Sequence, residues 1–182
     1  MILLGIGANL PSATFGPPRA TCGAALESLE KSSIYISQRS RWYETAPIPV
    51  SDQPWYVNGV VAVTTSLPPD TLMTTLLKIE THLGRSRGHR NAPRVVDLDL
   101  LAYNDRIINE PPQAPLRLQI PHPRMHERLF VINPLLDISQ NWVHPVLGRS
   151  AASLRDDLLG AQEIHNLPDA DGLFGTEWRS EK

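Results

Sequence analysis

Hydrophobic positions recur along the chain with two different periods, and these periods predict strands and helices in alternation. The apolar run at 2–8 is typical of a short buried strand. Cys22, Ala25, Leu26 and Leu29 recur at helical spacing and predict a helix over 19–31. The same reasoning predicts strands over 33–43, 56–65 and 95–103, and a helix that Pro68 and Pro69 start and Gly84 ends.

This order of elements predicts an α+β fold. The pattern β-α-β-β-α-β favours a ferredoxin-like two-layer sandwich, with helices packed on one face of an antiparallel sheet. A strand at 116–120 and a short helix at 127–136 follow. We expect residues 1–164 to form a single domain that contains all the candidate chemistry. Residues 165–182 mix Asp, Gly, Pro and isolated aromatics, and we expect a loosely attached tail there.

Composition narrows the classes of function. The net charge of -2 among 182 residues gives no reason to expect nucleic acid or a membrane surface as a partner. No apolar run approaches about 18 residues, and no basic segment precedes the apolar start, so neither a membrane span nor a signal peptide is expected. Cys22 is the single cysteine, which excludes a disulfide framework within the chain and suits a cytoplasmic, reducing location.

The basic residues are distributed unevenly. The chain has three lysines and fourteen arginines, and eight of the arginines lie between Arg85 and Arg128. A guanidinium fork matches the oxygens of phosphate, so this cluster indicates an anion site. Residues 84–93 within it lack any apolar periodicity, and we expect an exposed loop that becomes ordered when ligands bind.

Two aspartates lie directly after this loop. Residues two apart on a strand share a face, so Asp97 and Asp99 project together while Leu98 points into the core. Paired carboxylates can hold Mg²⁺, which binds one or two carboxylates together with substrate phosphates. An isolated pair of aspartates is more often a solvated strand face. Here the preceding loop carries Arg85, Arg87 and Arg90, and this combination favours phosphoryl transfer. The chain contains neither a P-loop nor a complete dinucleotide fingerprint.

Two further segments offer recognition chemistry. Tyr56 and Asn58 share a strand face, and an aromatic ring beside an amide could stack on a flat heterocycle and read its edge. Considered without the other segments, Tyr56 and Asn58 are more commonly a surface tyrosine and a strand-end asparagine with no binding role. His122 lies between two prolines and, with Arg124 and Arg128, could meet phosphate or nucleotide. We expect no metal at His122 and His126, because no third ligand is close.

Together these stretches resemble the 6-hydroxymethyl-7,8-dihydropterin pyrophosphokinases over about residues 4–137. The resemblance is carried by GANL at 7–10, YET at 43–45, QPWYVN at 53–58, ETHLGRSR at 80–87, PRVVDLD at 93–99 and PHPR at 121–124. It implies a folate-pathway enzyme that moves pyrophosphate from ATP onto the pterin hydroxymethyl group and releases AMP. One departure is Asn91, which stands where well-known members carry an aromatic residue.

The resemblance also implies roles for particular residues. The pterin would be bound by Thr45, Pro47, Ile48, Tyr56, Asn58, Asp97 and Phe130. ATP, the co-substrate, would be bound by Arg85, Arg87, Arg90, Arg94, Leu100, His122 and Arg128. Two Mg²⁺ ions would be held by Asp97 and Asp99, and the catalytic set would be Arg87, Arg90, Arg94, Asp97 and Asp99. Glu80 would anchor the loop, and the enzyme would act as a monomer.

Two other classes of function remain open on the sequence. A metal-dependent nucleotidyl- or glycosyltransferase could use the same aspartate pair, and its products would differ from AMP. A ferredoxin-like ligand-sensing or RNA-binding module is the alternative without catalysis. RNA readers of this shape carry aromatic residues on central strands with few acidic neighbours, so the aspartates argue against it.

Overall fold

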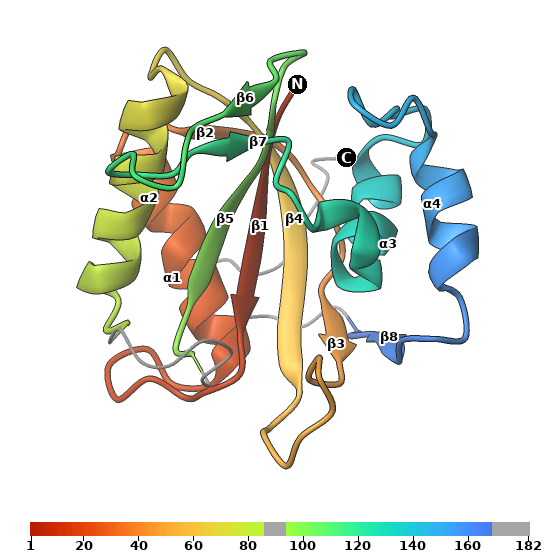
Figure 1. Ribbon diagram of the computed structural model, residues 1–182. Helices are drawn as coiled ribbons and strands as arrows, with labels where there is room; N and C mark the ends of the chain where they lie inside the picture. The colour runs from red at the N-terminus through yellow and green to blue at the C-terminus, as the bar shows by residue number, and fades with distance from the viewer. Residues whose placement is uncertain (86–93, 169–182) are drawn as a thin grey trace, which may run out of the picture.

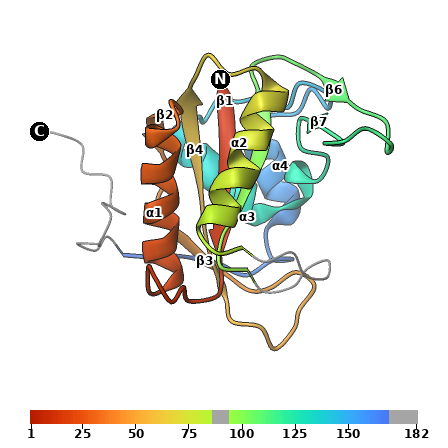
Figure 2. The same cartoon turned by 90° about the vertical axis from the view of Figure 1, so that its left-hand side faces the viewer.

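An antiparallel sheet runs through the centre of the molecule, with helices on both of its faces (Figures 1 and 2). The structure is a computed structural model that describes residues 1–85 and 94–168. The sheet has the strand order β5-β1-β4-β3-β8, and β2 pairs with β4 beyond the end of β3. This is the antiparallel α+β sandwich that the element order predicts.

The first half of the chain builds most of the sheet. Its elements are β1 (Ile2–Ala8), α1 (Pro18–Lys31), β2 (Tyr35–Arg39), β3 (Tyr43–Thr45), β4 (Tyr56–Thr64) and α2 (Pro69–His82). Proline occupies the first position of both helices, where the missing N–H costs nothing. Gly84 follows α2 with φ of 97°, a conformation that favours glycine.

The second half completes the sheet and adds a layer. Its elements are β5 (Asp97–Tyr103), β6 (Ile108–Asn109), β7 (Gln119–Ile120), the 3₁₀ turn η1 (Met125–Glu127), α3 (Leu129–Ile138), α4 (Ala151–Leu158) and β8 (Ile164–Asn166). Among the described residues, no helix has the length and apolar composition needed to cross a membrane.

Alternation along β1 divides the core into two clusters. Leu4 and Ile6 face α1 and α2, and they belong to the larger cluster of buried residues. Leu3 faces the opposite way, into a cluster built by α3 and α4. Helices therefore cover both faces of the sheet, and α3 and α4 add a layer that the expectation of helices on one face omitted. Gly5 and Gly7 follow Leu3 on the α3 face, where their lack of side chains leaves room above the sheet.

The predicted strand over 33–43 is confirmed at its centre, where β2 lies, and is wrong over 40–42, where the chain leaves the ladder before β3 begins. The Ser40 hydroxyl accepts a hydrogen bond from the backbone N–H of Val60 at 3.0 Å. Trp42 is buried in the larger cluster, with its ring against Gly59. These contacts with β4 set the break, and they join residues that are seventeen to twenty positions apart in the sequence.

The boundary expected for the C-terminal tail, between residues 164 and 165, falls inside a strand. Residues 164–166 form β8, which pairs with β3 at the edge of the sheet. The backbone N–H of Leu167 then donates to the carbonyl of Trp42 at 2.9 Å. The segment up to 168 is therefore part of the domain, and residues 169–182 lie outside the described part of the chain.

Candidate active site

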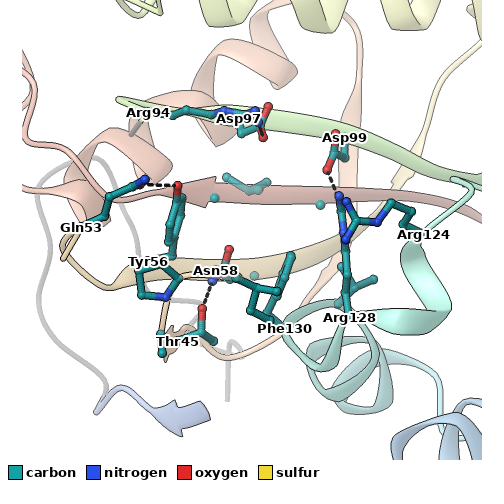
Figure 3. A pocket seen from close by; sticks show the side chains of 18 of the residues that line it. Thr45, Gln53, Tyr56, Asn58, Arg94, Asp97, Asp99, Arg124, Arg128 and Phe130 are labelled. Carbon is teal, nitrogen blue, oxygen red and sulfur yellow. Dashed lines mark hydrogen bonds and ion pairs between the residues drawn. The ribbon is translucent and has the colours of Figure 1, made fainter. Parts of the chain in front are cut away.

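A pocket opens on the α3 face of the sheet, over the ends of β1, β4 and β5 (Figure 3). Most of the residues predicted for the site line it: Thr45, Pro47, Ile48, Tyr56, Asn58, Arg94, Asp97, Asp99, Arg128 and Phe130. Strands β3, β4 and β5 carry five of these residues, and the start of α3 with the turn before it carries two. The fold thus brings three distant segments of sequence to one cavity.

The two aspartates lie at one end of this pocket. They alternate with Leu98, which is buried on the opposite face of β5. Asp97 forms an ion pair with Arg94 and another with Arg85, whose Nη1 lies 2.7 Å from Asp97 Oδ1. Arg128 Nη1 lies 3.3 Å from Asp99 Oδ2. Burial and the charge of Asp97 raise the pKa of the Asp99 carboxyl to about 6, against the opposing effect of Arg128.

This donor set suits Mg²⁺ better than a metal that needs a full protein cage. Among the described residues, no cluster contains three or more His, Cys, Asp or Glu side chains able to share a metal ion. Mg²⁺ keeps much of its coordination shell for water and substrate phosphate, so two carboxylates suffice. The guanidiniums that now neutralise Asp97 and Asp99 are also suitable donors to phosphate oxygens.

Glu80 supports this end of the pocket from beneath. Its Oε1 accepts a hydrogen bond from the backbone N–H of Leu98 at 2.7 Å and also pairs with Arg85. Burial raises the pKa of the Glu80 carboxyl to about 7, while the Leu98 N–H and Arg85 act to lower it. Arg85 does not line the pocket itself and reaches it through Asp97. Glu80 therefore ties α2 to β5 at the point where the aspartates begin.

The other end of the pocket is a slot with an amide at its base. Asn58 is 6 % exposed, and its Nδ2 donates to Thr45 Oγ1 at 2.7 Å. Tyr56 and Phe130 stand on either side of Asn58 (Figure 3). The Tyr56 hydroxyl donates to Gln53 Oε1 at 3.3 Å, and burial raises the pKa of this phenol. Two rings and a fixed amide are the groups that recognise a flat, hydrogen-bonding heterocycle.

Asn9 has a structural role in the site that the sequence did not reveal. Its side chain is buried, with Oδ1 accepting from the backbone N–H of Arg94 at 2.7 Å and Nδ2 donating to the carbonyl of Pro54 at 3.1 Å. It thereby joins the end of β1 to both ends of the pocket. Its signals in the sequence are a polar residue directly after a buried strand and its place in the GANL segment at 7–10. Arg124, which was expected near phosphate, lines the pocket. Gln53 and Glu127 also line it, and no site role was predicted for them.

Leu100 and His122 do not line the pocket, unlike most of the predicted residues. Leu100 is 4 % exposed and packs into the core between the sheet and α1 and α2, so its side chain points away from the pocket. His122 lies beside the pocket, where its Nδ1 accepts from the backbone N–H of Arg124 at 3.1 Å. Burial and Arg128 lower the pKa of His122 to about 4, so the imidazole is neutral at pH 7. The predicted catalytic residues Arg87 and Arg90 lie outside the described residues.

Comparison with known proteins identifies relatives. The family model described as 7,8-dihydro-6-hydroxymethylpterin-pyrophosphokinase matches residues 3–140. The 2-amino-4-hydroxy-6-hydroxymethyldihydropteridine pyrophosphokinase of Synechocystis is 37% identical over 153 residues, which cover 84% of this chain and 73% of the relative. The folic acid synthesis protein of Pneumocystis carinii is 44% identical over 129 residues, or 71% of this chain.

The share of each relative's length that this chain matches differs widely. The match spans 17% of the Pneumocystis protein and 21% of the corresponding Dictyostelium discoideum protein, so this chain corresponds to a small part of each. Among solved structures, wild-type Plasmodium falciparum HPPK-DHPS superposes with a TM-score of 0.65 at 15% identity, covering 87% of this chain and 44% of that one. At that identity the likeness concerns the fold alone.

Proposed function

The chain belongs to the 7,8-dihydro-6-hydroxymethylpterin-pyrophosphokinase family, and on this premise we propose that it transfers pyrophosphate from ATP to 6-hydroxymethyl-7,8-dihydropterin. The observation that carries the proposal is one pocket with a ring-and-amide slot at one end and a carboxylate pair among arginines at the other. A substrate that joins a flat heterocycle to a reactive hydroxymethyl group spans these two ends.

The slot binds the pterin ring and sets its orientation. Tyr56 and Phe130 supply aromatic surface on either side, and Asn58 presents its amide to the edge of the ring. The bond from Asn58 to Thr45 keeps the amide in one orientation, so the hydrogen-bond pattern is fixed before the ligand arrives. A preorganised amide discriminates against rings whose edge does not match it.

The aspartate end handles the triphosphate. Asp97 and Asp99 would hold Mg²⁺, which supplies neutralisation of the phosphate charge when bound. Arg94 and Arg128 line the same part of the pocket and donate to phosphate oxygens. Neutral His122 beside them offers its Nε2–H as a further donor, because Nδ1 is already used as an acceptor.

The transfer then needs alignment more than covalent help from the protein. The hydroxymethyl oxygen attacks the β-phosphorus of ATP and loses its proton to solvent. The bond between that phosphorus and the oxygen bridging to the α-phosphate breaks, and AMP leaves with the bridging oxygen. Fixing both substrates in one pocket turns an encounter of two molecules into a reaction within one complex.

The test compares matched aspartates. Asp99→Asn removes a pocket carboxylate, whereas Asp105→Asn removes an exposed one in the turn just after β5. With ATP, Mg²⁺ and the pterin, wild type and Asp105→Asn should form AMP at similar rates, and Asp99→Asn should form almost none. Pyrophosphate as the product would favour a nucleotidyltransferase instead, and equal rates in all three proteins would reject the assignment of the aspartates.

A further inference from the structure

We propose that Gln162 is a positioning residue that sets the Phe130 side of the slot. The inference rests on the proposed function, because it assigns Gln162 to the pterin site. Gln162 lies between α4 and β8, beyond residue 140, where the match to the family model ends. It is far in sequence from every residue that lines the pocket.

The Gln162 side chain bridges two backbone groups of one turn. Its Oε1 accepts from the backbone N–H of Leu129 at 2.8 Å, and its Nε2 donates to the carbonyl of Glu127 at 2.8 Å. These two groups lie on either side of Arg128. A glutamine amide is the uncharged side chain that offers both a donor and an acceptor at this length.

The turn needs an outside partner because α3 lacks a cap of its own. Arg128 is the residue at the N-cap, has an extended backbone, and makes no capping bond with its side chain. The first N–H groups of a helix have no partner within it, and Leu129 is the first residue of α3. Gln162 supplies the missing acceptor from 33 residues away.

The same turn carries two walls of the pocket. Arg128 reaches Asp99 at 3.3 Å, and its guanidinium carbon lies 5.5 Å from the centre of the Phe130 ring. Both side chains line the pocket. A shift of the turn would therefore move the aromatic wall of the slot and the cation beside Asp99 together.

The segment that carries Gln162 is itself fixed to the opposite side of the slot. Ile164 in β8 pairs with Thr45 in β3, and the N–H of Ala46 donates to the carbonyl of Glu163 at 3.4 Å. Figure 1 shows β8 beside β3, at the end of the connection from α4. Thr45 holds Asn58, so one short segment sets the spacing between the amide and Phe130.

The experiment compares two glutamines. Gln162→Met keeps the length of the side chain and loses both hydrogen bonds. Gln119→Met is the control, because the Gln119 amide is exposed and bonds Asn109 in the β6–β7 hairpin, whose residues do not line the pocket. Pterin dissociation constants are measured by calorimetry at 25 °C on protein shown to be folded by circular dichroism. Hydrogen exchange of the Leu129 amide is followed in parallel.

Loss of a helix cap predicts that Gln162→Met weakens pterin binding about 3- to 30-fold and raises the Michaelis constant for the pterin, while Gln119→Met changes neither. Gln162→Glu keeps the acceptor and loses the donor, so its effect should be intermediate, and it serves if Gln162→Met fails to fold. Unchanged pterin affinity in folded Gln162→Met, or equal weakening in Gln119→Met, overturns the proposal.

The two failures are separable. If wild type binds pterin but forms no AMP, the proposed function fails and Gln162 is still judged by the pterin dissociation constants. If wild type forms AMP and Gln162→Met binds pterin as wild type does, only the role of Gln162 fails. A wild type that binds no pterin overturns both.

Discussion

Replacing Gly7 by alanine tests how the slot is built. Gly7 pairs directly with Asn58 across β1 and β4. A Cβ atom on Gly7 would lie 2.8 Å from Asn58 Oδ1, a separation that real Cβ atoms do not sustain. The Asn58 amide would have to move, although it is buried and held by Thr45 at 2.7 Å.

The cost follows from what Asn58 loses. Moving the amide breaks a buried hydrogen bond and leaves a polar group without a partner, which costs about 1–3 kcal/mol. If the pterin depends on the orientation of this amide, its affinity should fall about 5- to 100-fold in Gly7→Ala. Calorimetric titration with the pterin measures this directly.

Gly5→Ala is the matched control on the same strand. Its Cβ would lie 3.4 Å from a terminal methyl carbon of Leu101, an ordinary contact with a side chain that can adjust. We expect a much smaller loss of pterin affinity than in Gly7→Ala. If Gly7→Ala binds the pterin with wild-type affinity, the proposal that the Asn58 amide recognises the edge of the pterin ring is refuted. An equal loss in both variants would show that any added methyl group near the slot disturbs it.

The remaining predictions concern other parts of the pocket. Asp97→Asn and Asp99→Asn should each abolish nearly all AMP formation with an unchanged circular dichroism spectrum, since both side chains point away from the core, and near-normal rates in both would contradict this. Phe130→Ala should weaken pterin binding more than binding of an ATP analogue, and equal calorimetric losses for the two ligands would argue against stacking. The pKa of His122 is about 4 in the folded protein against about 6.5 when unfolded, so the unfolded state binds more protons between these values and stability falls as the pH falls through them. Between pH 7 and about pH 5, the free energy of unfolding measured in urea should therefore fall by up to about 2 kcal/mol less for His122→Gln than for wild type. If the two proteins lose the same free energy over this range, the imidazole of His122 is not held neutral by burial.

Local patterns were sufficient to predict the central elements of the fold. The period of apolar residues predicts β1, α1, β4, α2 and β5 within a few residues, because each of them buries one continuous face or stripe. The alternation along β5 likewise predicts that Asp97 and Asp99 share a face. Sequence reasoning therefore finds the elements in which a periodic run of apolar residues marks the buried face.

Contacts between distant segments explain what the sequence did not reveal. The break between β2 and β3 depends on Ser40 and on the packing of Trp42 against Gly59. The strand β8 has only three residues, and pairing with β3 gives it its structure. Gln162 acts on a turn more than thirty residues away, and no local pattern reports such a bond.

The assignment of Leu100 to ATP came from a family resemblance by position, and it stays a prediction. The parity of β5 directs that side chain into the core with Leu98, as strand alternation predicts. Strand alternation thus gives the direction of the side chain, which a match by position does not give.

The most direct test of the proposed function is mass spectrometry of a single reaction mixture that contains the protein, ATP, Mg²⁺ and 6-hydroxymethyl-7,8-dihydropterin. The account predicts a pterin product heavier by two phosphoryl groups and one AMP for each pterin consumed. It also predicts that no AMP forms when the pterin is omitted. A pterin of unchanged mass, or one that gains a single phosphoryl group with release of ADP, would contradict it.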